Sequence, residues 1–396
     1  MTEKLFQPAL QVIEKIEEAG FEAYIVGGAV RDMLLNKPVH DVDIATSAKP
    51  EEVMNIFKKV IPVGVEHGTV LVRCEHQSYE VTTFRTETGY SDFRRPDQVE
   101  FIGNLEGDLS RRDFTINAMA MNKQLQLVDF YQGQHDLSQS VIRTVGDPNL
   151  RFQEDPLRMM RAIRFASQLG FYIETQTQKA IDQHASLLQH IAIERISVEW
   201  EKTLAGQSLG YSLDMLFRTE LYKYLPIIRT DTIIQEHLRN QRESLPNMAS
   251  FIALYHLFQP SITIQNWIKA WKLSNKTKNE AMILSDSVKQ YPNQSTWTIY
   301  QTPTYLLPDF VKLYGIYIKD QLDLDQLRME KERLPIQDRQ ELAITGNDLL
   351  SLFPDKPKGP WIAKYLQQVE RAVIERQVTN NKVKIREWLK NEAFFT

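Results

Sequence analysis

The stretch "HDVDIATSAKP", residues 40–50, places two aspartates one residue apart at the start of an apolar run. If it is a strand, Asp41 and Asp43 share one face, because strand side chains alternate between faces. Carboxylates this close repel each other, and burying them unpartnered is costly. Bound Mg²⁺ removes that penalty, since it prefers carboxylate oxygens. An isolated D-x-D is equally explained by a strand end or a helix cap, so its surroundings decide.

The preceding segment supports a phosphate site. "VGGAVRD", residues 26–32, places two glycines between a predicted strand and a predicted helix. Gly27 and Gly28 allow the backbone to approach a phosphate, and the first turn of the helix offers free N–H groups. Arg31, one turn later, adds a fork of donors. The dinucleotide fingerprint G-x-G-x-x-G is absent, so this is a different kind of nucleotide site.

Composition narrows the class of protein. The 396 residues carry a net charge of −4, which argues against a protein that coats DNA nonspecifically but permits an anionic partner gripped locally. Cys74 is the only cysteine, which excludes a disulfide framework or a multi-cysteine zinc site and favours a cytoplasmic location. We expect no membrane span, since no stretch approaches the roughly 18 apolar residues that one needs.

The pattern of elements changes along the chain. The first third alternates strand and helix signals, which predicts an α/β unit. Its predicted elements are a helix over 5–19 that stops at Gly20, a strand over 21–28, a helix over 29–36, a strand over 41–47, a helix over 49–57 and two strands within 68–85. Residues 86–97 predict a long mobile loop and residues 110–120 a capped helix. From about residue 149 the signals are helical, so we place a boundary near 145–148.

Five motifs together resemble class II CCA-adding tRNA nucleotidyltransferases of the bacterial type, relatives of the DNA polymerase β-like nucleotidyltransferases. They lie between residues 27 and 171 and read "GGAVRD", "DVDIAT", "EVTTFR", "RRDFTINAMA" and "EDPLRMMRAIRFASQLGF", and "ERISVEWEK", residues 194–202, matches a later motif of the family. The resemblance implies an α/β head with a mixed sheet, followed by an all-α neck, body and tail. The expected domains are a catalytic head over 1–147, a neck with the base-recognition motif over 148–215, a body over 216–285 and a tRNA-binding tail over 286–396.

The resemblance also implies an activity. Such enzymes add C, C and A to the 3′ end of tRNA from CTP and ATP, without a template, in a Mg²⁺-dependent transfer that releases pyrophosphate. The expected partners are therefore the tRNA acceptor end, CTP and ATP, and a homodimer is left open. Asp41 and Asp43 would be catalytic and hold the metal, with Glu80 as a candidate third ligand, although strand alternation could equally place it on a solvent face.

Other residues are expected to bind the nucleotide. Gly28, Arg31 and Arg112 are candidates for phosphate or ribose contacts. Asp113 would bind ribose or orient Arg112, unless the two form a structural ion pair. The segment 194–202 is interpreted mainly as scaffold of the neck.

Base selection without a template needs one acceptor beside one donor. Cytosine and adenine each present an amino donor next to a ring acceptor, whereas guanine and uracil present the reverse order. An Asp/Arg pair meets this need, because carboxylates only accept and guanidiniums only donate. Asp155 and Arg158, at i and i+3, supply such a pair on a helix surface. Asp155 followed by Pro156 also fits an ordinary helix N-cap, and both roles are compatible.

Arg161 and Arg164 continue the stripe that begins at Arg158. A solvated basic face would explain them, but by resemblance they contact the nucleotide or position the base-reading pair. Near the end of the chain, a basic cluster beside Trp388 is a candidate for tRNA backbone binding, unless the tryptophan is a core residue and the cluster a solvated face. The cluster consists of Lys382, Lys384, Arg386 and Lys390.

Three rival functions share parts of this pattern. A bacterial poly(A) polymerase shares the head and neck motifs but tends to carry a strongly basic extension. A partial enzyme that adds only CC or only A is the second rival, and CC-only relatives have a shortened loop at the position of 86–97. This loop has full length and includes Arg94, Arg95 and Asp97, which favours complete CCA addition. The third rival is a non-catalytic RNA-binding protein with a degenerate head.

Overall fold

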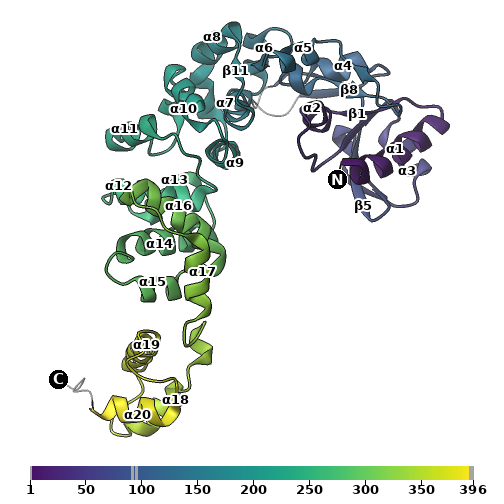
Figure 1. Cartoon of the computed structure of the whole chain (residues 1–396). Helices are drawn as coiled ribbons and strands as arrows, with labels where there is room; N and C mark the ends of the chain where they lie inside the picture. The colour runs from purple at the N-terminus through teal and green to yellow at the C-terminus, as the bar shows by residue number, and fades with distance from the viewer. Residues whose placement is uncertain (1, 91–92, 94–96, 392–396) are drawn as a thin grey trace. The chain divides into compact units, whose positions relative to one another are not determined.

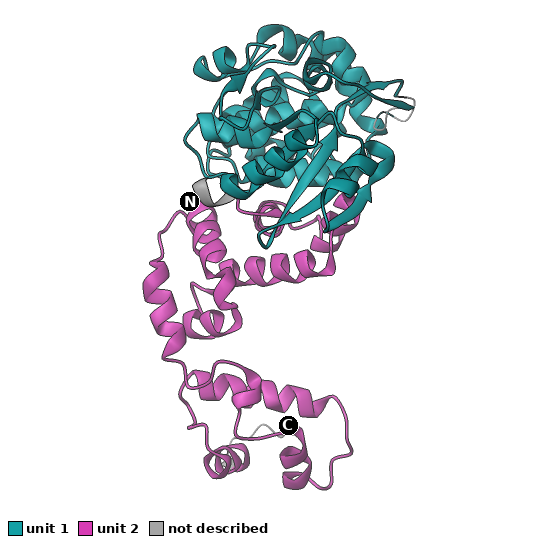
Figure 2. Ribbon diagram, turned by 90° about the vertical axis from the view of Figure 1, so that its right-hand side faces the viewer, with its two compact units in different colours: residues 1–244 teal, residues 245–396 magenta. Residues whose placement is uncertain are grey.

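The computed structural model describes residues 2–90, 93 and 97–391 (Figure 1). The chain divides into two compact units, residues 1–244 and 245–396 (Figure 2), and each is described by itself. In the part of the chain described, no helix is both long and apolar enough to cross a membrane.

A seven-stranded mixed sheet forms the base of the first unit. Its strand order is β3-β4-β5-β2-β1-β8-β9. Only β2 and β5 run parallel, and the other neighbouring pairs are antiparallel. The strands are β1 (Ala23–Val26), β2 (Asp43–Thr46), β3 (Val60–Gly64), β4 (Thr69–Cys74), β5 (Gln77–Thr83), β8 (Ala120–Met121) and β9 (Leu127–Val128). The buried side chains of Ile25, Ile44 and Val81 show why the central strands are apolar. The mixed sheet confirms the predicted α/β head.

Short helices accompany this sheet. They are α1 (Thr2–Glu18), α2 (Gly28–Leu34), α3 (Pro50–Ile56), α4 (Leu105–Ser110) and α5 (Gly133–Ser138). In α1 the side chains of Val12, Ile13 and Ile16 are fully buried, as the helical period predicted. Gly20, just beyond the helix, has a φ of 91°, a conformation that glycine adopts without strain.

The segment 110–120 is not the capped helix that we predicted. The helix α4 ends at Ser110, and only a 3₁₀ turn over Thr115–Asn117 follows before β8. The Asp113 carboxylate accepts hydrogen bonds from the Phe114 backbone N–H at 2.8 Å and from the Asn117 side chain at 3.0 Å. Local bonds of this kind compete with helix formation.

Two other local predictions need correction. Residues 86–88 do not belong to a loop, because β6 (Arg85–Thr88) pairs antiparallel with β7 (Gln98–Phe101). Of the loop residues, Arg94 and Arg95 lie outside the described residues. The predicted strand over 41–47 begins only at Asp43, so Asp41 lies in the connection that precedes β2.

Helices dominate the rest of the first unit. They are α6 (Pro148–Glu154), α7 (Leu157–Leu169), α8 (Thr175–His184), α9 (Ile193–Leu204), α10 (Leu209–Arg218) and α11 (Thr232–Asn240), and a two-stranded parallel pair joins β10 (Val141–Ile142) to β11 (Tyr172–Ile173). The helix α7 packs against both α9 and α10. Met160, Ile163 and Trp200 are fully buried, so this packing fixes how α7 and α9 are turned toward each other.

The described part of the second unit is all helical. Its helices are α12 (Met248–Phe258), α13 (Ile264–Trp271), α14 (Asn275–Gln290), α15 (Ser295–Gln301), α16 (Leu307–Ile318), α17 (Leu324–Glu332), α18 (Gly346–Leu352), α19 (Trp361–Ile374) and α20 (Lys382–Asn391). Phe251 packs edge-on against Trp267 and Trp271 in one core. Val369, Val373 and Ile385 belong to a second core cluster. The helical region agrees with the predicted fold class.

Two predicted domain boundaries fall inside helices. The boundary at 215/216 cuts α10 (Leu209–Arg218), and the boundary at 285/286 cuts α14 (Asn275–Gln290). Helical hydrogen bonds continue across both positions, so these boundaries must move. The finer division into head, neck, body and tail stays a prediction.

A buried lysine joins two helices of the second unit. The Lys331 side chain on α17 is only 7% exposed. Its ammonium group donates to the carbonyl oxygens of Ile299, Tyr300 and Thr302 at 2.8, 2.9 and 2.8 Å. These carbonyls end α15, where a positive charge is favourable.

Replacing Lys331 should therefore destabilise the protein. We expect Lys331→Met to lower the free energy of unfolding by about 2–3 kcal/mol, because three buried carbonyls lose their charged donor. Urea denaturation measures this change. The matched control is Lys289→Met, since Lys289 is exposed on α14. Equal stability of the two variants would contradict the structural role of Lys331.

Candidate active site

One cavity brings most of the predicted site residues together. It has a volume of about 740 Å³ and lies within the first unit. Nine of the residues predicted for metal or nucleotide binding line it: Gly28, Arg31, Asp41, Asp43, Arg112, Asp155, Arg158, Arg161 and Arg164. Glu80 and the tail cluster are not among its lining residues. The size suits a small-molecule site.

The glycine turn leaves room on one side of this cavity. Gly27 precedes α2 with a φ of 73° and a ψ of −134°, which is strained for other residues. A Cβ atom at Gly27 would lie 2.9 Å from an Arg112 guanidinium nitrogen. The backbone conformation therefore requires glycine at this position, and a Cβ atom would in addition displace the Arg112 guanidinium.

The two aspartates lie at the start of β2. Asp43 is the first residue of the strand and is paired in register with Glu80 of the parallel strand β5. Loss of hydration raises the pKa of Asp43, and the nearby carboxylates of Glu80 and Asp41 raise it further, whereas Arg112 opposes the shift. Asp41, although outside the strand, lines the same cavity. This negative charge is partly uncompensated, which is the condition that a bound cation relieves.

Two carboxylates fit a magnesium ion that keeps water and substrate phosphates as its other ligands. Among the described residues, no group of three or more His, Cys, Asp or Glu side chains forms a metal cluster. Glu80 is exposed on β5, so its assignment as a third ligand stays a prediction.

Arg31 and Arg112 lie beside the glycine turn. The Arg31 guanidinium donates to Asn117 at 2.7 Å and to Asp32 at 2.9 Å. Arg112 is not paired with Asp113, as one reading of the sequence suggested, but contacts Asp108 at 3.4 Å. Its buried Nε atom has no hydrogen-bond partner within the described structure. Arg112 therefore keeps unused donors next to the cavity, which suits an anionic ligand.

The arginines of the stripe on α7 are all paired, and Arg158 and Arg164 are buried whereas Arg161 is partly exposed, so the stripe is not a solvated face. Arg161 binds Asp113 at 2.6 Å, and Arg164 binds Glu199 at 2.9 Å. Burial raises the pKa of Asp113, but Arg161 and the Asn117 hydrogen bond outweigh it and lower the pKa to about 2. Burial, reinforced by the neighbouring Arg161, lowers the pKa of Arg164 to about 10.

Asp155 and Arg158 line the cavity but are held by different partners. One carboxylate oxygen of Asp155 accepts from the Leu157 backbone N–H at 3.0 Å at the start of α7, although Pro156 and not Asp155 is the N-cap residue of this helix. The Arg158 guanidinium donates to Glu154 at 2.7 Å and to the Arg111 carbonyl at 3.0 Å. Both residues are thus fixed in place before any ligand binds.

Sequence reasoning missed a second row of lining residues. Arg195, Glu199 and Lys202 of α9 are spaced at i, i+4 and i+7, so they share one helix face. Glu199 is buried against Arg164, whereas Arg195 and Lys202 line the cavity. The spacing alone could have signalled a functional face in the segment that we interpreted as scaffold.

The charge of the cavity differs from that of the chain. Eight basic side chains and five acidic side chains line it, although the whole chain has a net charge of −4. The basic ones are Arg31, Arg111, Arg112, Arg158, Arg161, Arg164, Arg195 and Lys202, and the acidic ones are Asp32, Asp41, Asp43, Asp113 and Asp155. An anionic ligand is therefore favoured locally.

The predicted tail cluster is partly committed to structural contacts. Lys382 and Arg386 both bind Asp348 of α18, at 2.5 and 3.4 Å. Lys384 pairs with Glu387 on its own helix at 3.1 Å. Trp388 packs against the second core cluster, as the alternative interpretation expected. Lys390 is exposed.

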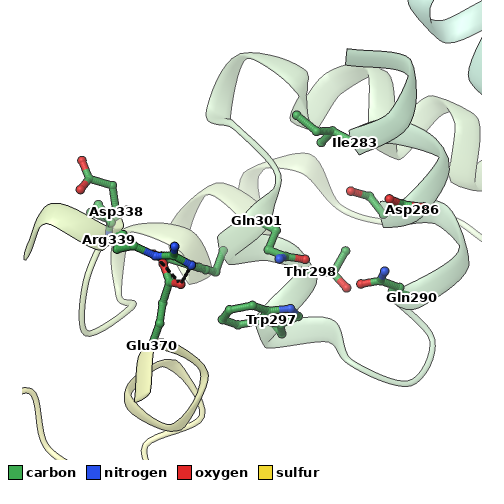
Figure 3. A pocket seen from close by; sticks show the side chains of 12 residues that line it. Ile283, Asp286, Gln290, Trp297, Thr298, Gln301, Asp338, Arg339 and Glu370 are labelled. Atoms are coloured by element: carbon green, nitrogen blue, oxygen red, sulfur yellow. Dashed lines mark hydrogen bonds and ion pairs between the residues drawn. The ribbon is translucent and has the colours of Figure 1, made fainter. Parts of the chain in front are cut away.

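A separate cavity lies within the second unit (Figure 3). It has a volume of about 400 Å³, and none of the predicted site residues lines it. The side chains of Arg339 and Glu370 point toward each other across one side of it and form an ion pair. The Tyr300 hydroxyl donates to Glu370 at 2.5 Å. These contacts join α15 and α19, which explains why Glu370 is buried.

Three family models match this chain. A "Poly A polymerase head domain" covers residues 23–143, a "Probable RNA and SrmB- binding site of polymerase A" covers 170–231, and a "tRNA nucleotidyltransferase domain 2 putative" covers 246–389. The first model contains both Asp41 and Asp43.

Relatives that are similar over nearly the whole chain include several CCA-adding enzymes. The CCA-adding enzyme of Oceanobacillus iheyensis is 43% identical, over 98% of this chain and 98% of its own. That of Anoxybacillus flavithermus is 44% identical, over 97% of this chain and 96% of its own. The crystal structure of the Bacillus stearothermophilus CCA-adding enzyme in complex with CTP matches with a TM-score of 0.86 and 38% identity, over 97% of this chain and 96% of that one. This chain therefore belongs to the CCA-adding enzymes, a family of nucleotidyltransferases.

Proposed function

We propose that this chain adds C, C and A to the 3′ end of tRNA from CTP and ATP and releases pyrophosphate. The observation that carries the proposal is the single cavity that is lined by Asp41 and Asp43 together with Asp155 and Arg158. Chemistry and base selection can then act on one bound nucleotide. Full-length similarity to CCA-adding enzymes supports complete CCA addition, and no observation favours a poly(A) polymerase or a partial enzyme.

The metal of this family is typically a divalent cation, and we propose Mg²⁺ held by Asp41 and Asp43. When bound there, it would supply the positive charge that activates the attacking hydroxyl and stabilises the leaving pyrophosphate. The tRNA 3′ oxygen forms a bond to the α-phosphorus, the bond to pyrophosphate breaks, and the hydroxyl proton leaves to solvent. Such transfers depend on positioning and electrostatics, and no covalent nucleophile is needed.

The remaining residues of the cavity are assigned by their charge and partners. Gly28 leaves space for the triphosphate, and Arg31 and Arg112 bind it, since Arg112 has donors to spare. Arg161 and Arg164 orient the site through Asp113 and Glu199.

We propose that Asp155 and Arg158 read the base. Asp155 accepts from the amino group of cytosine or adenine, and Arg158 donates to the adjacent ring nitrogen. Guanine and uracil would instead place a carbonyl oxygen against the Asp155 carboxylate and an N–H group against the Arg158 guanidinium. Each unpaired group costs about 1–3 kcal/mol in a buried site.

The outer parts of the chain are proposed to hold the RNA. In this scheme the head lies within 1–147, the neck begins at 148, and the body and tail follow. Lys384 and Lys390 are the tail residues more available to phosphates, because Lys382 and Arg386 are bound to Asp348. A cytoplasmic location, which suits a tRNA substrate, stays a prediction.

Incorporation of labelled nucleotides tests the proposed function. The substrate is a tRNA transcript that lacks its 3′ CCA, offered each nucleotide alone and all four together. The proposal expects C, C and then A, with GTP and UTP refused and growth ending after A. A long A tail on any RNA would identify a poly(A) polymerase instead, and growth ending after CC would identify a partial enzyme.

Removing either aspartate should abolish transfer while sparing RNA binding. For Asp41→Asn and Asp43→Asn we expect kcat to fall by at least about 100-fold, because metal-based charge stabilisation contributes several kcal/mol. The control is Asp182→Asn, since Asp182 is exposed on α8. Transfer assays and filter binding of tRNA measure the two properties. An Asp41→Asn enzyme as active as the control would contradict the metal assignment.

The raised pKa of Asp43 predicts a specific dependence on pH. Protonated Asp43 cannot bind a cation, so the rate should fall as pH decreases through the raised pKa. Higher Mg²⁺ concentrations should move this acidic limb to lower pH, because the cation competes with the proton. Glu80→Gln should also move the acidic limb to lower pH, because removing the like charge beside Asp43 lowers the pKa of Asp43. If the pH at which the rate falls does not change with the Mg²⁺ concentration, protonation of Asp43 is not the cause of that fall.

A further inference from the structure

The base-reading carboxylate has a second partner that the sequence did not predict. The Arg195 guanidinium, from α9, donates to Asp155 Oδ2 at 2.8 Å. We propose that Arg195 is a positioning residue that fixes the Asp155 carboxylate for base selection. The inference rests on the proposed role of Asp155 in reading the base.

The two contacts on Asp155 fix the plane of its carboxylate. Oδ1 accepts from the Leu157 N–H at 3.0 Å, and Oδ2 accepts from Arg195 at 2.8 Å. With one oxygen held by the backbone and the other by a side chain, rotation about the last side-chain bond would break both bonds. A carboxylate has about four acceptor positions, so an amino group can still bind beside these donors. Arg195 thus orients the Asp155 carboxylate and still leaves acceptor positions free for the base.

The setting of this ion pair favours a geometric role. The Arg195 and Asp155 side chains are 23% and 17% exposed, so the pair is more shielded than ordinary surface pairs. In the described part of the chain, Asp155 is the only hydrogen-bond partner of the Arg195 guanidinium. The backbone of α9 is itself held by the buried Ile196 and Trp200. Arg195 therefore extends from a well-packed helix and contacts Asp155.

Arg158 is held independently of Arg195. Its guanidinium donates to Glu154 and to the carbonyl oxygens of Arg111 and Arg151. Loss of Arg195 should therefore disturb the acceptor half of the base-reading pair and leave the donor half in place. This separation makes the effect of Arg195 testable through Asp155 alone.

We expect Arg195→Gln to raise KM for CTP and ATP about tenfold with a smaller change in kcat, the cost of a weakened hydrogen bond to a charged group. The low kcat/KM for UTP and GTP should hardly change, because these bases gain nothing from Asp155. Discrimination between CTP and UTP should therefore fall about tenfold. Arg195→Lys, which retains the charge, should recover part of the loss.

A double-mutant cycle decides whether Arg195 acts through Asp155. Kinetics with CTP are measured for wild type, Arg195→Gln, Asp155→Asn and the double variant, with thermal melting to confirm folding. The control is Arg218→Gln, an exposed arginine of α10 outside the cavity. We expect Arg195→Gln to cost about tenfold in the wild-type background and almost nothing beside Asp155→Asn.

Equal losses in both backgrounds would overturn the proposal, because Arg195 would then act on the nucleotide directly. An Arg195→Gln enzyme that matches Arg218→Gln would also overturn it. Failure of the proposed function is a separate outcome, since it would appear as wild-type protein that does not add C, C and A. If Arg195→Gln does not fold, the same double-mutant cycle is measured with Arg195→Lys in its place.

Discussion

The crowding of arginines around one cavity is the constraint on which the rest of the site depends. Arg158, Arg161 and Arg164 follow one another on α7 and would repel if left unpaired. Each is matched by a carboxylate, namely Glu154, Asp113 and Glu199. Breaking one such buried pair typically costs about 3–5 kcal/mol, because a charge is left without a partner. The same pairs that stabilise the fold therefore hold these side chains at the wall of the cavity.

These carboxylates come from different parts of the fold, so their ion pairs with the arginines of α7 connect those parts to α7. Asp113 follows α4 on the sheet side, whereas Glu199 belongs to α9. Asp113 is linked through Asn117 to Arg31 on α2, beside the glycine turn. A chain of polar contacts thus runs from the phosphate end of the cavity to α7. Such a network is rigid only when every member is satisfied.

Local sequence signals predicted the sheet side of the site well. The periodicity of α1, the hairpin of β4 and β5 and the glycine turn depend on neighbouring residues, so the sequence contains their cause. The proposed base-reading role of Asp155 and Arg158 came from the resemblance to CCA-adding enzymes, and the need for an acceptor beside a donor to separate C and A from G and U supported it. Asp155 both contacts the first turn of α7 and lines the cavity, so the two interpretations of this residue are compatible.

The remaining features depend on partners distant in sequence. The segment 110–120 was mistaken for a helix because the hydrogen bonds that Asp113 accepts from the Phe114 backbone N–H and from Arg161 override helix propensity. Arg195 was read as scaffold because nothing near it in sequence shows that Asp155 lies within reach, forty residues away. The structural contacts of the tail cluster could not be predicted for the same reason, since Asp348 binds two of its members.

A crystal structure of this protein with CTP and Mg²⁺ tests the central claim most directly. The account predicts the cytosine amino group within hydrogen-bonding distance of Asp155, the ring nitrogen facing Arg158, and the triphosphate between Arg112 and a cation held by Asp41 and Asp43. A base bound away from Asp155 and Arg158, or a triphosphate with no cation at the two aspartates, would contradict it.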